Sequence, residues 1–200
     1  EFDNYSIHNS FPDFLIIDDN QNFKLYKFDK KTKNFSDLNL DFWGDNFYED
    51  NQLYLSNKKS LIKFSIDQNA TVWRYELPAG KYDWEDKFGK FEGEIQKIIG
   101  VYEDVLWISL TIGNLVGLSL KDGSVLYDLV VPNNMSEILP EYDHFGANYS
   151  VFDPDRGKIF GMRLNYYWEV DLQSPTTSYL LYDIKTSAEK FVSNVNEIEY

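Results

Sequence analysis

Two histidines, His8 and His144, are the only imidazoles that the chain offers for acid–base catalysis or metal binding. A Ser–His–Asp triad or a histidine metal site would need one of them. His144 is the better candidate because it lies in a polar, aromatic segment, residues 140–146, whereas His8 lies on an expected strand. The spacings of nucleophile, zinc-helix and phosphate-loop motifs are absent, and the chain has no cysteine. We therefore expect no catalytic residue and no metal.

Pairs of carboxylates also recur along the chain, and paired carboxylates can hydrolyse glycosidic bonds. The pairs are Asp18 with Asp19, Glu49 with Asp50, Glu103 with Asp104, and Asp153 with Asp155. A catalytic pair would occur once per site, whereas these pairs recur beside successive expected strands. Because Asp and Asn bond their own backbone in tight turns, the recurrence favours turns over catalysis. Residues 153–157 also lack the alternating oxygen ligands of a calcium loop.

Aromatic residues on long connections are the candidates for ligand binding. Residues 79–94 and 132–147 are much longer than the turns of about two to five residues that join hairpin strands, and both hold aromatics beside carboxylates. Such a surface suits a sugar, a peptide or a partner protein. Alternatively, the rings fold back and cover the ends of the sheets. The candidate binding residues are Trp43, Tyr82, Trp84, Tyr142, His144, Tyr167 and Trp168.

The elements that must position these residues are hairpins of one repeated kind. Each hairpin has an alternating apolar strand, a polar turn and a second strand, and the four lie at residues 25–35, 61–73, 115–127 and 180–191. Two shorter expected strands precede each hairpin, which gives units at residues 4–40, 46–78, 95–131 and 148–193. A lone hairpin cannot bury its apolar face, so such repeats must stack on their neighbours. The sequence predicts a single all-β domain, a β-propeller or partial propeller of about four four-stranded antiparallel blades.

Two segments leave details of this architecture open. Residues 165–172 either extend the second strand of the fourth unit or form a separate hairpin. Residues 195–200 have the pattern of an opening strand, which would either start a further blade or pair with the first unit and close a ring.

The third unit carries a resemblance to a known family. Residues 103–109 and 113–127, with a glycine before the third strand and Gly123 ending the next turn, resemble the repeat of the PQQ-like and WD40-like β-propeller superfamily. The other units place Lys33, Asn69 and Ala188 near the position of Gly123. Quinone-dependent enzymes of this superfamily carry a vicinal cysteine pair over the cofactor, and this chain has no cysteine, so we expect no cofactor. The continuous apolar run around Trp107 predicts a strand covered on both faces, with this tryptophan buried.

Charge and hydropathy narrow the range of partners. Nineteen basic and 33 acidic residues give a formal net charge of −14, which repels nucleic-acid phosphates and anionic lipids. No apolar run approaches the roughly 18 residues of a membrane span, so we expect neither nucleic-acid binding nor membrane insertion. The chain begins at Glu1 rather than at a methionine, which fits either removal of a signal peptide or a start chosen for expression. Of these two readings we expect the first, which implies a periplasmic or secreted protein.

We expect a non-catalytic binding or scaffolding module that recognises a protein or a carbohydrate through an aromatic, acidic loop face. If residues 195–200 open another blade, the remaining blades of a longer chain are further partners. Two alternatives stay open: a carbohydrate-active enzyme with carboxylate catalysis, and an acidic inhibitor or immunity-type protein that binds a basic partner. The enzyme would need two carboxylates about 5–10 Å apart in a concave site. The inhibitor would need a contiguous acidic patch.

Overall fold

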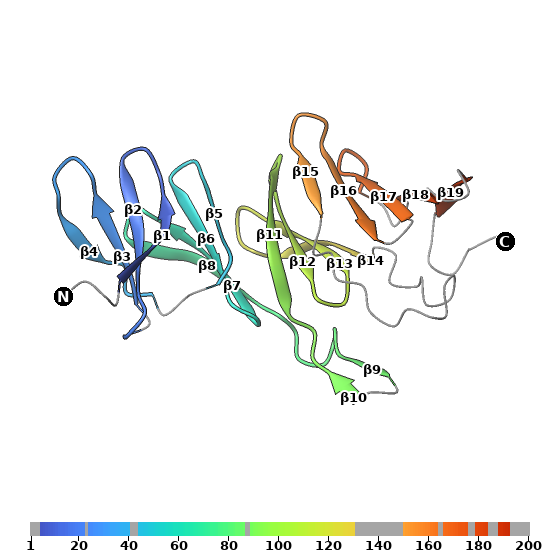
Figure 1. Ribbon diagram of the computed structural model, residues 1–200, viewed down its shortest axis with the longest axis horizontal. Helices are drawn as coiled ribbons and strands as arrows, with labels where there is room; N and C mark the ends of the chain where they lie inside the picture. The colour runs from blue at the N-terminus through green and yellow to red at the C-terminus, as the bar shows by residue number, and fades with distance from the viewer. Residues whose placement is uncertain are drawn as a thin grey trace. The chain divides into compact units, whose positions relative to one another are not determined.

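The computed structural model describes residues 5–22, 24–40, 44–86, 89–130, 150–163, 166–175, 179–183 and 188–192. Every regular element within these ranges is a β-strand (Figure 1). The described residues accordingly contain no helix with the length and apolar character to cross a membrane. The strands form four antiparallel sheets in chain order and one separate hairpin, which confirms the prediction of an all-β protein.

Sheets 1, 2 and 3 have four strands each, and every strand pairs with the next one along the chain. Sheet 1 contains β1 (Tyr5–Ser10), β2 (Phe14–Asp19), β3 (Lys24–Asp29) and β4 (Phe35–Asp37). Sheet 2 contains β5 (Asn46–Glu49), β6 (Gln52–Ser56), β7 (Ser60–Ser65) and β8 (Ala70–Glu76). Sheet 3 contains β11 (Ile95–Tyr102), β12 (Val105–Leu110), β13 (Asn114–Ser119) and β14 (Val125–Val130).

Sheet 4 has one strand more than the other sheets. It contains β15 (Val151–Asp153), β16 (Lys158–Arg163), β17 (Tyr166–Asp171), β18 (Tyr179–Asp183) and β19 (Ala188–Val192). The segment that the sequence left open, 165–172, supplies β17, which pairs with β16 on one side and β18 on the other. It is therefore a strand of its own, and the expected hairpin at residues 180–191 remains the last hairpin of the sheet. Residues 195–200 lie outside the described residues, so their role stays a prediction.

The last hairpins of sheets 1, 2 and 3 share one turn. A residue with positive φ stands in each turn: Lys33 at 62°, Asn69 at 49° and Gly123 at 74°. In sheets 1 and 3 its N–H donates to the carbonyl oxygen four residues earlier, at Asp29 and Ser119, over 2.9 Å. The repeat therefore preserves a left-handed backbone conformation, although only sheet 3 fills it with glycine, the residue that adopts it most easily.

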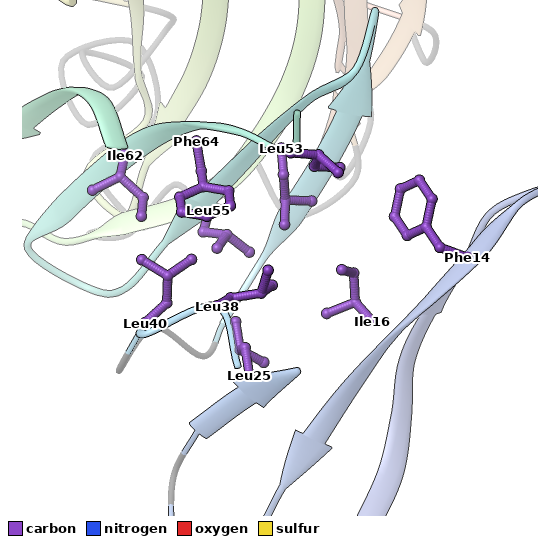
Figure 2. Packing of buried hydrophobic residues seen from close by; sticks show 10 residues of the cluster. Phe14, Ile16, Leu25, Leu38, Leu40, Leu53, Leu55, Ile62 and Phe64 are labelled. Carbon is purple, nitrogen blue, oxygen red and sulfur yellow. The ribbon is translucent and has the colours of Figure 1, made fainter. Parts of the chain in front are cut away.

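The chain divides into two compact units, Glu1–Asn57 with Leu61–Arg74, and Lys58–Ser60 with Tyr75–Tyr200. The core of the first unit lies between sheets 1 and 2, whose side chains point toward one another in Figure 2. Its members are aliphatic or phenylalanine: Phe14, Ile16, Leu25, Leu38, Leu40, Leu53, Leu55, Ile62, Phe64 and Ile66. Six of them occupy alternate positions of β2, β6 and β7, as strands with one face on a core require.

The second unit has its own core between sheets 3 and 4, built around two tryptophans. Trp107 is 1% exposed, as the sequence predicted, and its ring stacks on Tyr127 with centroids 5.4 Å apart. Each tryptophan pairs across strands with a glycine, Trp107 with Gly117 and Trp168 with Gly161. A methyl group at Gly161 would lie 2.6 Å from the ring of Trp168, so the glycine leaves room for the ring to lie against the backbone.

Candidate functional site

The structure describes the side chains of two of the seven candidate binding residues. Tyr82 and Trp168 are each 3% exposed, and Trp168 belongs to the core between sheets 3 and 4. Only the backbone is described for Trp84, on β9 (Trp84–Asp86), and for Tyr167, on β17. Trp43, Tyr142 and His144 lie outside the described residues. Whether these residues contact a partner stays a prediction. Tyr82 is hydrogen-bonded within a cluster of polar side chains.

Tyr82 belongs to what we call the Asp128 cluster, formed by Lys81, Tyr82, Asn114 and Asp128. The Tyr82 hydroxyl donates to Asp128 Oδ2 over 3.0 Å, and Lys81 Nζ lies 2.7 Å from the same oxygen. Asn114 Nδ2 donates to Asp128 Oδ1 over 2.9 Å. Lys81 Nζ also lies 4.9 Å from the centre of the Tyr82 ring, a cation–π contact. The cluster joins the connection after β8 to β13 and β14 of sheet 3.

The electrostatics of the cluster favour an ionised Asp128 beside a neutral Tyr82. Burial alone would raise the pKa of Asp128, but the hydrogen bonds from Lys81, Asn114 and Tyr82 outweigh burial and hold this pKa below its usual range. Burial, and next the charge of Asp128, raise the pKa of the Tyr82 phenol. Both carboxylate oxygens therefore have donors, which makes Asp128 an anchor for the connection rather than a free base.

Tyr82 is a candidate from the sequence, but its hydrogen-bond partner Asp128 is not. Asp128 is separated from Tyr82 by 46 positions, a distance over which the pattern of a single chain predicts no contact. One signal was present: Asp128 is the only charged residue of β14, whose other members are Val, Leu and Tyr. A carboxylate on such a strand needs a partner, since an isolated buried charge is costly.

The segment expected to be a long loop contains a small hairpin, β9 with β10 (Gly89–Phe91). Figure 1 shows this hairpin extending past the end of sheet 3. Lys59 Nζ lies 2.8 Å from Glu92 Oε2 and donates to the Gly93 carbonyl oxygen over 2.9 Å. Lys58 pairs with Glu94 at 3.2 Å. These contacts fix the base of the hairpin, where side chains of both charges reach solvent.

His8 and the carboxylate pairs have structural contacts. Asn46 Nδ2 donates to His8 Nε2 over 2.8 Å, which leaves the His8 Nδ1 proton directed toward Asp18 Oδ2, 3.9 Å away. Asp19 Oδ1 accepts from the backbone N–H groups of Gln21 and Asn22, both over 3.1 Å. These bonds confirm the turn interpretation at Asp19.

The three other pairs also lie at turns. Asp50 and Glu103 have positive φ, 47° and 52°. Asp153 Oδ1 accepts from the Arg156 N–H over 3.1 Å, as an Asp at the start of a turn does. No group of three or more potential metal-ligating side chains occurs within the part of the chain that the structure describes.

Comparison with known proteins identifies the fold. No family model and no curated protein matches the chain. Among solved structures, BamB from Moraxella catarrhalis is 12% identical with a TM-score of 0.52, and the match covers 90% of this chain and 60% of that one. A chain of the mitotic checkpoint complex is 8% identical with a TM-score of 0.54, at 90% and 60% coverage. The β-propeller domain of Cps50 (Swd1) from Myceliophteria thermophila is 9% identical with a TM-score of 0.54, at 90% and 65% coverage.

The chain spans less than two thirds of the length of these three structures. At 8–12% identity the likeness shows the fold alone, and it supports no narrower family within the superfamily that the third unit resembles. The sequential antiparallel sheets and these matches together show that the chain has a β-propeller or partial β-propeller fold.

Proposed function

We propose that the chain is a non-catalytic binding module that recognises a partner protein. The contact is made by the β9–β10 hairpin, which extends past the end of sheet 3. The observation that carries this proposal is the way the hairpin is held. Tyr82 and Asp128 anchor the connection before it, and the pairs of Lys58 and Lys59 fix its base. A binding element that is rigid before it meets its partner loses little conformational entropy on binding.

The charges around the hairpin favour a protein over a sugar. Lys58 and Lys90 are 77% and 70% exposed in their side chains, and Glu92, which pairs with Lys59, is 69% exposed. Interspersed charges of both signs fit the polar rim of a protein interface, where they guide association and orientation. The mitotic checkpoint complex, which contains a chain of this fold, is by its name a protein assembly.

The test is a quantitative pull-down from extracts of the source organism with the wild-type chain and two variants. The hairpin variant combines Lys58→Glu with Lys90→Glu, and the control is Lys31→Glu with Lys33→Glu in the exposed turn after β3. A protein recovered with the wild type and the control, and lost with the hairpin variant, would support the proposal. A partner that both variants retain, or binding to a glycan array in place of a protein, would contradict it.

A further inference from the structure

One backbone hydrogen bond recurs in all four sheets and sets them in a common register. In each sheet the N–H of the residue after the third strand donates to the carbonyl oxygen of the residue before the second strand, over 2.8–3.2 Å. The four donors are Lys30, Ile66, Leu120 and Leu172. Counting back from the donor matches residues of sheet 1 to their equivalents in sheets 2 and 4: Tyr26 to Ile62 and Trp168, and Phe28 to Phe64 and Val170.

The equivalent residues of sheet 2 lie on a face that packs on the preceding sheet. Ile62 pairs with Leu55, and Phe64 pairs with Leu53. All four side chains are at most 1% exposed, in the core shared with sheet 1. We call the face that carries these two cross-strand pairs the receiving face.

Sheet 4 repeats this arrangement. Val170 pairs with Ile159, and both belong with Trp168 to the core shared with sheet 3. The earlier sheet of each core contributes its opposite face, marked by Leu25 in sheet 1 and by its equivalent Leu115 in sheet 3. The packing therefore has a direction: the receiving face of one sheet covers the Leu25-type face of the sheet before it.

The receiving face of sheet 1 is open. Ile17 pairs with Tyr26 on it, and together with Tyr5 and Phe35 these side chains line a hollow of about 340 Å³. Phe35 is 58% exposed and Tyr5 is 46% exposed. Single exposed apolar residues are common, but a contiguous aromatic face around a hollow is typical of an interaction surface.

Lys30 departs from the apolar pattern of this face. It occupies the position of Ile66 and Leu172, which are 5% and 4% exposed. The Lys30 ammonium donates to the Phe11 carbonyl oxygen, and over 3.3 Å to the Ser10 hydroxyl oxygen. Its charge thus has partners next to β1 of the same sheet, and the receiving face around Tyr26 and Phe28 stays apolar.

The direction of packing indicates what covers this face. Its complement is a Leu25-type face, and those of sheets 1 and 3 already lie in the two described cores. Leu61, the equivalent in sheet 2, is 0% exposed, and sheet 4 has Tyr167 at this position in place of leucine. The matched propellers extend further than this chain, since each match leaves more than a third of the solved chain uncovered. A propeller of this size has further blades, and each blade packs only on its neighbours.

We propose that the receiving face of sheet 1 binds the Leu25-type face of a further blade, supplied by the same polypeptide outside residues 1–200. The two apolar faces pack at the usual spacing of about 10 Å between sheets. The contact uses sheet 1 and not the β9–β10 hairpin, so it stands or falls independently of the proposed function.

The first test is hydroxyl-radical footprinting of two wild-type proteins, the 200-residue chain and the complete product of its gene. In the 200-residue chain Phe28 should be oxidised faster than Phe64, its buried equivalent. In the complete product the oxidation rate of Phe28 should fall to that of Phe64, and Tyr26 should be protected with it. Leu126 on β14, which is 51% exposed and lies outside the receiving face, is the control and should keep its rate. Phe28 and Tyr26 that stay reactive in the complete product would overturn the proposal.

Photo-crosslinking identifies what covers the face. Phe35→p-benzoylphenylalanine puts the probe at an exposed position beside the hollow, and circular dichroism checks that the variant is folded. In the complete gene product we expect a cross-link to a strand outside residues 1–200, in a species with the mass of one copy. A cross-link within residues 1–200, to a second copy or to another protein would overturn the proposal.

Discussion

Replacing Asp128 with asparagine separates the charge of the Asp128 cluster from its shape. The amide keeps an oxygen for Asn114 but removes the charged acceptor for the Tyr82 hydroxyl and the Lys81 ammonium. Hydrogen bonds to charged groups contribute about 1.5–3 kcal/mol each. The Asp128 side chain is 25% exposed and that of Lys81 is 48% exposed, so solvent screens part of the ion pair. We therefore expect a total loss of about 2 kcal/mol in the free energy of unfolding.

The assay is thermal and urea unfolding of wild type and Asp128→Asn at neutral pH. For a chain of 200 residues, about 2 kcal/mol lowers the melting temperature by roughly 4–8 °C. Asp104→Asn is the matched control, because Asp104 is an exposed carboxylate in the turn between β11 and β12 of the same sheet. The control should change the free energy of unfolding by no more than about 0.5 kcal/mol.

The pH dependence tests the cause of the effect. The pKa of Asp128 is lowered in the folded state, so its ionised form stabilises the fold above its unfolded pKa of about 3.9. This contribution is lost as the pH falls from about 4 through the folded-state pKa. The gap between wild type and Asp128→Asn should be constant from neutral pH to about pH 5 and close below about pH 4. A gap that persists in strong acid, or no gap at neutral pH, would refute the electrostatic reasoning.

Four other predictions concern the scaffold and one of its buried groups. Trp107→Ala should cost about 3–5 kcal/mol, measured by urea unfolding, because it leaves a cavity beside Tyr127 that the sheets cannot close. Gly123→Ala should cost about 1 kcal/mol in the same assay, since alanine resists the left-handed conformation. Lys33→Gly at the equivalent turn should not destabilise the chain, and a loss above about 0.5 kcal/mol would count against the shared turn. Burial, and next the charges of Glu49 and Asp50, raise the pKa of Tyr54 to about 12. Its phenol should therefore ionise at higher pH than exposed tyrosines, and an ultraviolet pH titration of wild type against Tyr54→Phe measures this step.

The hairpins could be predicted from the sequence because their information is local. Alternation of apolar and polar residues gives strands, and a polar turn between two strands gives their pairing. The turn equivalence of Lys33, Asn69 and Gly123 was also within reach, although its conformation was not. Trp107 was predictable as buried because its strand is apolar on both faces.

Other features depend on contacts that no local pattern contains. The run Tyr166-Tyr-Trp-Glu-Val170 fits the end of one strand as well as the start of another, and only its partners β16 and β18 decide between them. The strands β9 and β10 have three residues each, too few to show a period. For Tyr82, aromatic character predicted exposure at a binding surface, but the distant Asp128 carboxylate gives its hydroxyl a buried partner.

The sequential strand order has a consequence for how the chain folds. Among the described residues, every sheet pairs only strands that follow one another along the chain, so each sheet closes short loops before it packs on another. Low contact order of this kind favours fast formation of the individual sheets, and the slower event is the docking of one sheet on the next. The two described cores each join one pair of sheets, so cooperativity is of the nearest-neighbour kind. A lesion such as the loss of Trp107 should therefore raise amide hydrogen exchange in sheets 3 and 4 while sheets 1 and 2 keep their protection.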